Sequence, residues 1–360
     1  MQIGIIGLPN SSKTTIFDAL TRSNEETTPF SSGQFEIHSA IVDVPDPRVD
    51  RLADMFCPRK VTRAQVQYND IAGLAPGAGK SGGIAGPLLN AVAASDALLH
   101  VVRAFDDDAV LHTRGKVDPV RDLRDLDAEL ILSDLVIVER RMERLEKDAR
   151  RSGPIGDAAR AEIALMERFK EALESEIPLR DLDITPEEER QVRGFALLTL
   201  KPVLVVLNVG DTGPSDPSAI LTYPHRRSSV IALRGALERE IAQLDADAAE
   251  LFLTEYGITE PSLRRMIRQS YDLLGLQSFF TVGEDEVRAW TIHRGDTAVQ
   301  AAGVIHTDLS RGFIRAEVVA YEDLVTAGSL AEAKQRGVLL LQGRDYVVLD
   351  GDILNIRFNV

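Results

Sequence analysis

The first two hundred residues alternate short apolar runs with amphipathic stretches. Apolar runs at residues 3–6, 64–69, 97–102 and 203–207 predict strands that are buried on both faces. Residues 16–20, directly after the first run, read as a helix. Buried strands separated by helices are typical of a mostly parallel sheet that is covered by helices on both sides. The pattern therefore predicts an α/β fold.

A long helical pattern interrupts this alternation at residues 127–193. Leu135, Val138 and Met142 recur at helical spacing, and charged side chains fill the other faces. Residues 152–154, Ser-Gly-Pro, break the pattern before a second helical stretch follows. We expect an antiparallel helical hairpin. Its charged faces are those of a solvated helix pair, or of a surface for a partner.

The hairpin divides the α/β domain into residues 1–126 and 194–275. A different sequence pattern begins at residue 276. There, short β-rich runs alternate with turn glycines, which predicts a small α+β domain over residues 276–360. Its expected strands lie at residues 279–281, 287–291, 313–319 and 346–349, and its expected helices at residues 297–304 and 321–324.

Composition narrows the classes of function. The 360 residues carry a formal net charge of −15, which argues against a DNA-binding protein. The single cysteine excludes an internal disulfide framework and fits a reducing compartment. The sequence has no leader pattern at its start and no apolar run long enough to span a bilayer, so we expect a cytoplasmic protein without a membrane partner.

The segment GLPNSSKTT, Gly7–Thr15, lies between the first strand and the first helix. It matches the phosphate-binding pattern G-x-x-x-x-G-K-[ST] except that Ser12 replaces the second glycine. In this pattern backbone N–H groups wrap the phosphates, Lys13 reaches the β- and γ-phosphates, and Thr14 binds Mg²⁺. The order of strand, loop and helix is the one that this chemistry requires.

Two further strand ends support a nucleotide site. Asp70 ends the strand at residues 64–69 and is followed by Gly73, a D-x-x-G arrangement that suits magnesium-bound water and a γ-phosphate. Asn208 and Asp211 form N-x-x-D after a later strand, where an amide can bind a base edge. Each is an ordinary turn residue when taken alone; together and in this order they predict a P-loop nucleotide-binding domain.

With these residues in place, the chain resembles the YchF / Obg-like ATPase family of translation-factor-class P-loop proteins over nearly its whole length. The motifs that carry the resemblance are GLPN, VPDPR (44–48), DIAGL (70–74), HVVR (100–103), LTLKP (198–202), EVRAWTI (286–292), QAAGVIHTD (300–308), GFIRAEV (312–318) and the closing RFNV. The resemblance implies an OBG-type G domain and identifies the last domain as TGS-like, a β-grasp fold.

The resemblance also implies an activity and its residues. It implies Mg²⁺-dependent hydrolysis of ATP, or of GTP, and association with the ribosome or ribosomal RNA. Leu74 occupies the place of the water-orienting glutamine of classical GTPases, so hydrolysis should be slow, and the family offers His112 as the group that substitutes. His112 is equally compatible with an ordinary surface histidine. Asn10 matches a position that binds K⁺ in related proteins. The nucleotide-binding positions are Asn10, Ser11, Ser12, Lys13, Thr14, Thr15, Gly73, Asn208, Val209 and Asp211, with Thr14 and Asp70 at the metal.

The chain departs from the family pattern at several positions. Switch I, residues 24–38, lacks a clear counterpart of the magnesium-binding threonine; Ser31, Ser32 or the backbone near Gln34 are the alternatives. Asp211 replaces a glutamate, which resembles a guanine-binding motif, but Val209 stands where the lysine over guanine would lie. The choice between ATP and GTP stays open, with ATP favoured by the family.

Three hypotheses follow. The first is a slow nucleotide hydrolase that serves as a ribosome-associated switch. The second is a nucleotide-binding module with little turnover that acts through its hairpin and last domain, as the Ser12 and switch I departures suggest. The third is an RNA-binding protein, for which the argument is a set of basic residues in the last domain: Arg288, Arg294, Arg311, Arg315 and Arg357. An acidic chain makes a solvated surface the better explanation of those arginines.

Overall fold

The computed structural model describes residues 1–359 apart from residues 23–26, 32–35, 72–85, 212, 257 and 259. The chain divides into two compact units. The first joins Met1–Val42 to Gln67–Met266, and the second joins Asp43–Val66 to Ile267–Val360. None of the helices in the described residues is long and apolar enough to cross a membrane.

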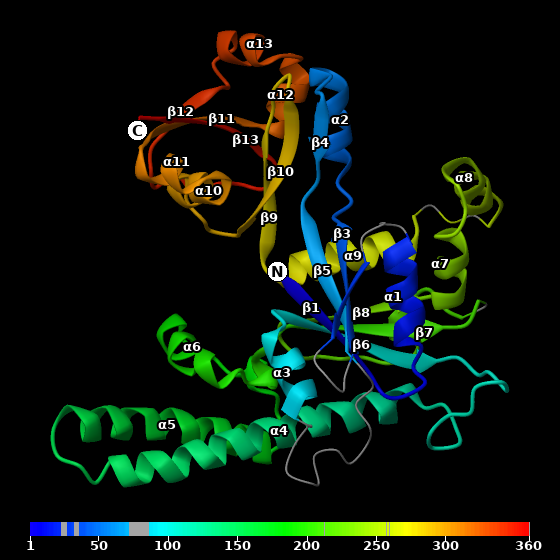
Figure 1. Cartoon of the computed structure of the whole chain (residues 1–360), viewed down its shortest axis with the longest axis vertical. Helices are drawn as coiled ribbons and strands as arrows, with labels where there is room; N and C mark the ends of the chain where they lie inside the picture. Colours follow the sequence, from blue (N-terminus) through cyan, green and yellow to red (C-terminus); the bar gives the residue numbers. More distant parts are fainter. Residues whose placement is uncertain are drawn as a thin grey trace. The chain divides into compact units, whose positions relative to one another are not determined.

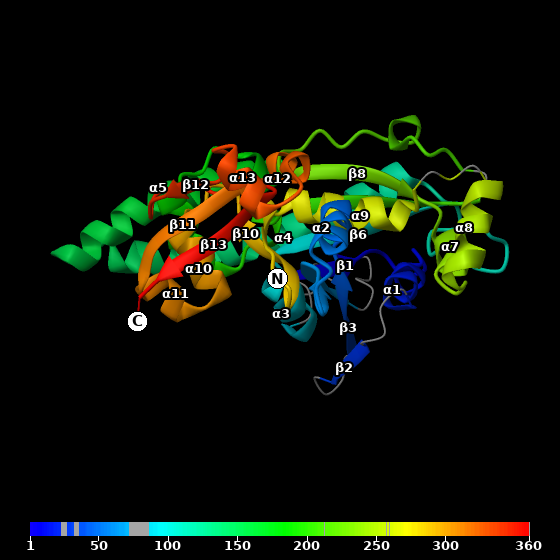
Figure 2. The ribbon, with the colours of Figure 1, turned by 90° about the horizontal axis from the view of Figure 1, so that it is seen from above.

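The first unit is built on a seven-stranded sheet with the order β2-β3-β5-β1-β6-β7-β8. Figure 2 shows this order from β8 through β6, β1 and β3 to β2. Strands β5, β1, β6, β7 and β8 run parallel, and β2 pairs antiparallel with β3. The bounds are β1 Gln2–Ile6, β2 Thr27–Ser31, β3 Glu36–Asp43, β5 Gln65–Asp70, β6 Ala97–Ala104, β7 Val203–Val209 and β8 Ser228–Leu233.

Helices cover both faces of this sheet, as the near-continuous apolar strands predict. Helices α1 and α7 pack together on one side, and α3 and α4 lie on the other (Figure 1). A core between the sheet and the second pair includes Leu98 and Val205 from strands and Leu123 and Leu126 from α4. The bounds are α1 Lys13–Arg22, α3 Gly86–Ala94, α4 Pro119–Asp148, α7 Gly235–Ile241, α8 Ala246–Glu255 and α9 Ser262–Leu273.

The predicted helical hairpin is present, with α4 and α5 (Pro154–Glu174) packed antiparallel (Figure 1). Their seam has its own apolar core, which includes Val138, Leu145 and Phe169. Helix α4 begins earlier than the pattern indicates, because Asp118 caps its first turn by accepting a hydrogen bond from Arg121 N–H. The short α6, Pro186–Val192, follows the hairpin.

A buried carboxylate fastens α4 to the chain that leads into β7. Asp134 is fully buried and accepts hydrogen bonds from the backbone N–H groups of Leu198 and Thr199 at 2.8 and 2.7 Å. It also accepts from the Thr199 hydroxyl at 2.6 Å. In the same LTLKP motif, the Lys201 ammonium donates to the carbonyls of Ala93 and Ser95. The motif is therefore structural within this unit.

The second unit carries a six-stranded mixed sheet with the order β12-β11-β13-β9-β10-β4. Helix α10 packs on it around a core that includes Phe279, Ile292 and Ala301, the α+β arrangement predicted for the last part of the chain. The bounds are α2 Pro47–Phe56, β4 Lys60–Thr62, β9 Leu276–Thr281, β10 Glu286–His293, α10 Ala298–Ile305, α11 Thr307–Arg311, β11 Phe313–Ala320, α12 Tyr321–Ala327, α13 Leu330–Gln335, β12 Leu340–Gln342 and β13 Asp352–Phe358.

The VPDPR motif ties residues 43–66 to this second unit. Asp46 caps α2 and forms an ion pair with Arg48, whose guanidinium also contacts Asp350 at 2.8 Å and lies over the Phe280 ring. Strand β4 then pairs in parallel with β10. A stretch that the sequence places inside the nucleotide-binding domain thus belongs to the compact unit of the C-terminal sheet.

One expected strand of the second unit is wrong. Residues 346–349 form no strand, apart from an isolated bridge at Val347, and the last strand is β13 at Asp352–Phe358. Gly351, with φ of +91°, turns the chain between the two segments. The apolar run at residues 346–349 instead packs through Val348 into the core.

Candidate functional site

The parallel strands bring the predicted site residues to one edge of the first unit. The phosphate loop follows β1, Asp70 ends β5, Asn208 lies near the end of β7, and Gly235 follows β8. Since carboxyl ends of parallel strands share an edge, these groups meet at the place where open α/β sheets bind ligands. The segment after β6, which carries His112, leaves from the same edge.

The phosphate loop has the backbone of a phosphate-binding turn. Asn10 and Ser12 adopt left-handed conformations, with φ of +64° and +66°. At Gly7 a Cβ atom would lie 2.5 Å from the Val101 carbonyl oxygen, so the close packing of the loop on β6 requires glycine. The left-handed φ of Ser12 explains why the usual pattern has glycine at its position.

We expect Ser12→Gly to stabilise the protein. A non-glycine residue in the left-handed region costs about 1–2 kcal/mol, and the extra chain entropy of glycine takes back about 0.5–1 kcal/mol. The net gain should be about 0.5 kcal/mol, measured as the free energy of unfolding in urea. Ser11→Gly is the matched control, because Ser11 has no positive φ, and it should bring no gain. A Ser12→Gly protein that is less stable than the original chain would contradict backbone strain at Ser12.

Lys13 is held in the phosphate loop by backbone carbonyls. Its side chain is buried, and its ammonium donates to the carbonyls of Gly7 and Leu8 at 3.2 Å each. Burial lowers the pKa of Lys13, and the negative charge of Asp70 opposes that shift. A phosphate anion would supply the negative charge that the two neutral carbonyls lack.

Thr14 and Asp70 form the pair that a metal ion would need. The Thr14 hydroxyl donates to Asp70 Oδ2 at 3.2 Å. The other oxygen of Asp70, Oδ1, is buried and has no hydrogen-bond partner among the described residues. Burial raises the pKa of this carboxyl group, an effect that Lys13 and Thr14 oppose. A buried carboxylate oxygen without a partner, beside a hydroxyl, fits Mg²⁺, which takes oxygen ligands. Among the described residues, no group of three or more His, Cys, Asp or Glu side chains is placed to hold a metal ion.

Asn208, the predicted base-binding residue, is held in place by the loop after β8. It is buried, and its Oδ1 accepts a hydrogen bond from Gly235 N–H at 3.0 Å. A Cβ at Gly235 would lie 2.7 Å from that oxygen, so the loop after β8 needs a glycine there. Val209 is buried and Asp211 is exposed. The contact leaves the Asn208 amide N–H groups as the polar edge for a base.

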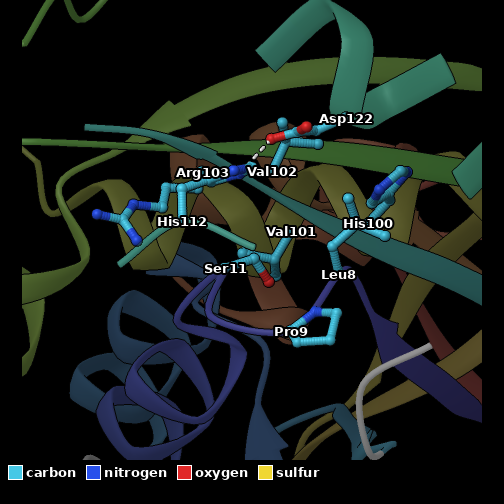
Figure 3. A pocket seen from close by; sticks show the side chains of 9 residues that line it. All are labelled: Leu8, Pro9, Ser11, His100, Val101, Val102, Arg103, His112 and Asp122. Carbon is cyan, nitrogen blue, oxygen red and sulfur yellow. Dashed lines mark hydrogen bonds and ion pairs between the residues drawn. The ribbon is translucent and has the colours of Figure 1, made fainter. Parts of the chain in front are cut away.

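His112 is a paired histidine in the interior of this edge. Its Nε2 lies 2.8 Å from Asp122 Oδ2, and both side chains are only 5 % exposed. Figure 3 shows the contact beside a cavity of about 10 Å³. The cavity is lined by Leu8, Pro9, Ser11, His100, Val101, Val102, Arg103, His112 and Asp122. His112 therefore is not an ordinary surface histidine, and its partner is one that the sequence did not indicate.

The HVVR motif holds the segment that leads to His112. The buried Arg103 guanidinium donates to the backbone carbonyls of Phe105, Asp107 and Val110 at 3.0, 3.3 and 2.8 Å. His100 in the same motif is fully buried, and burial lowers its pKa to about 3, so it is neutral at physiological pH. The HVVR motif marks Arg103 in the sequence, but no sequence pattern indicates that Arg103 binds the carbonyls of this segment.

Several predicted positions lie outside the described residues. These are Gly73 and Leu74, and Ser32 and Gln34 of switch I. Ser31 is described only as the last residue of β2. The metal ligand of switch I and the role of Gly73 stay predictions.

Comparisons with known proteins match the whole chain. A "Ribosome-binding ATPase YchF" of Bacillus subtilis is 42% identical over 364 residues, covering 99% of both chains, and that of Escherichia coli O157:H7 is 41% identical over 362 residues with the same coverage. The structure of the Schizosaccharomyces pombe YchF GTPase has a TM-score of 0.85 at 33% identity and covers 99% of this chain and 97% of that one. A family model named YchF-GTPase_C, described as a protein of unknown function (DUF933), matches residues 276–359.

Proposed function

The chain belongs to the YchF family, as its matches over the whole length show and as the sequence motifs predict, and we propose that it is a magnesium-dependent nucleotide hydrolase that works at the ribosome. The observation that carries the chemistry is the Thr14–Asp70 pair beside the buried Lys13, at the end of a strand–loop–helix unit. A phosphate loop with a cation and an oxygen pair for a metal suits phosphoryl transfer to water.

Each residue of this site has a distinct task. The loop N–H groups of residues 10–15 and the Lys13 ammonium bind and orient the phosphates. Thr14 would hold Mg²⁺ directly and Asp70 through water, and the bound ion would neutralise charge that develops on the phosphate oxygens. His112 is the group that we assign to the attacking water, since Leu74 cannot orient one. With no glutamine at that place, we expect slow turnover.

The predicted base site has one feature that suits GTP and one that does not. The relatives' names mention an ATPase and a GTPase. Here Asp211 is exposed and has the chemistry to accept from guanine, whereas Val209 offers no lysine to lie over the ring. We propose ATP as the preferred substrate, with GTP as a competitor.

The partner and the compartment follow from the relatives. The bacterial relatives are named as ribosome-binding proteins, and we propose ribosomal association in the cytoplasm for this chain. A K⁺ ion at Asn10 remains a secondary proposal. The Asn10 amide N–H donates to the Leu111 carbonyl at 3.2 Å, which leaves its carbonyl oxygen as the atom that would bind a cation.

The test is nucleotide affinity with and without the metal. Fluorescent ATP and GTP analogues should bind at least tenfold more tightly with Mg²⁺ than with EDTA, because the ion neutralises the phosphates that meet Asp70. In Asp70→Ala this difference should shrink, since the carboxylate that supports the ion is gone. Asp247→Ala, an exposed aspartate on α8 of the same unit, is the control and should keep it. Equal affinity with and without Mg²⁺ in the unaltered protein would contradict the proposal.

A nucleotide-binding module with little turnover remains the second candidate. The observation that favours it is that both ring nitrogens of His112 are occupied by Asp122 and by Arg114 N–H. Tight Mg²⁺–ATP binding without phosphate release, with and without ribosomes, would select this candidate.

A further inference from the structure

The imidazole of His112 has no nitrogen left for a water molecule. Arg114 N–H donates to Nδ1 at 3.1 Å, so Nδ1 is the unprotonated nitrogen. Nε2 then carries the proton and donates to Asp122 Oδ2 at 2.8 Å. A neutral imidazole has one donor and one acceptor, and both are used. His112 must give up at least one of these hydrogen bonds before it can orient or deprotonate water.

In the pair of His112 and Asp122, the Asp122 side chain is the one that is fixed in place. It lies in the first turn of α4, and its side chain is 5 % exposed. Its Oδ1 accepts from Arg121 Nε and Nη2 at 3.0 and 2.8 Å, which holds the carboxylate plane in place. The helix around it is packed into the sheet through Leu123 and Leu126. The contact with His112 therefore opens by movement of the His112 segment.

That segment is fastened along the stretch that precedes His112. Arg103 holds the carbonyls of residues 105, 107 and 110, as described above. The next carbonyl, that of Leu111, accepts from the side chain of Asn10 in the phosphate loop. A nucleotide that draws the Asn10 amide toward its phosphates would remove the contact next to His112. The Asp122 carboxylate is then the principal restraint on the ring.

We infer that Asp122 is a positioning residue that holds His112 in a retracted orientation, so that release of this contact limits nucleotide hydrolysis. The inference rests on the proposed role of His112 in hydrolysis. A carboxylate that orients a histidine for catalysis must leave the other ring nitrogen open, as in Asp–His pairs of hydrolases. Here Arg114 N–H occupies that nitrogen, which is why the contact restrains the ring.

The experiment compares the full chain with Asp122→Ala. Phosphate release at saturating Mg²⁺–ATP should rise about tenfold, the factor that corresponds to one lost hydrogen bond of ordinary strength. In the double variant Asp122→Ala with His112→Ala the rise should vanish. Glu143→Ala is the control, since Glu143 is an exposed carboxylate on the same helix, about six turns from Asp122, and takes part in neither hydrogen bond of the ring. It should leave the rate unchanged. A lower or unchanged rate in Asp122→Ala would overturn the inference.

A spectroscopic readout separates the inference from the proposed function. In the intact protein, the His112 ring should give an Nε2–H signal in long-range ¹H–¹⁵N spectra that is protected from solvent exchange. Asp122→Ala should remove the protection. Asp122→Asn keeps an acceptor oxygen and the side-chain volume, so it should fold even if the alanine variant does not, and should keep most of the protection. If His112→Ala hydrolyses ATP normally, the proposed role of His112 fails, while the protected signal still decides whether Asp122 holds the ring. An unprotected ring in the intact protein overturns the inference itself.

Discussion

Lys13→Ala should lower nucleotide hydrolysis at least 100-fold, the usual cost of removing one charge-stabilising donor from a transition state. Lys13 is buried in the phosphate loop, with its ammonium against the Gly7 and Leu8 carbonyls. No water-exposed lysine could replace a cation that is already in place and partly desolvated. Phosphate release at saturating ATP and GTP, with Mg²⁺, measures the effect.

The same variant should keep its fold. Burial lowers the pKa of Lys13, which means that the folded protein disfavours the charged form. Its removal therefore should not reduce the melting temperature. Lys13→Arg is the second variant: it keeps the charge, but a guanidinium does not match the geometry of the two carbonyls, so most activity should still be lost. A fully active Lys13→Ala protein would rule out phosphoryl transfer at this loop.

Asp134→Ala should destabilise the first unit by about 4 kcal/mol, because it leaves three buried donors without an acceptor at roughly 1–3 kcal/mol each. The donors are the N–H groups of Leu198 and Thr199 and the Thr199 hydroxyl. Urea unfolding measures the loss. Asp134→Asn keeps one acceptor oxygen and should lose about half as much. If both variants are as stable as the original chain, the hydrogen bonds of Asp134 do not hold α4 in place.

Asp134 also predicts a pH dependence of stability. Burial raises its pKa to about 6 in the folded chain, against 3.8 for an ordinary aspartate. A carboxyl group whose pKa is higher in the folded chain than in the unfolded chain stabilises the fold at pH values below the unfolded pKa. This contribution is lost as pH rises through about 6. The free-energy difference between the original chain and Asp134→Asn should therefore grow in favour of the original chain from pH 7 to pH 5. A difference that does not change over this range would contradict the raised pKa.

The parts of the fold that local pattern determines could be predicted. Apolar runs identified β1, β6 and β7, and the phosphate loop was identified from its lysine and threonine between a strand and a helix. Helical spacing identified the hairpin. These features depend on neighbours in sequence, which is what a pattern reports.

The parts that depend on distant neighbours could not be predicted. Residues 346–349 have strand-like composition, yet the sheet takes Asp352–Phe358 instead, because pairing with β11 decides the strand. The partnership of His112 with Asp122 requires the turn between them to fold back on α4. Gly235 matters through its approach to Asn208, 27 residues away in the chain. In each case the deciding atom lies on another element.

The length of α4 has a mechanical consequence. Its 30 residues form one helix, of about 45 Å at 1.5 Å per residue. Asp122 lies near one end and Asp134 near the middle, and the other half packs along α5 in the hairpin. Asp134 thus divides the helix into two arms of roughly 20 Å each. Because the near arm is packed into the sheet through Leu123 and Leu126, a load on the far arm would be carried by the hydrogen bonds of Asp134 and would leave Asp122 in place.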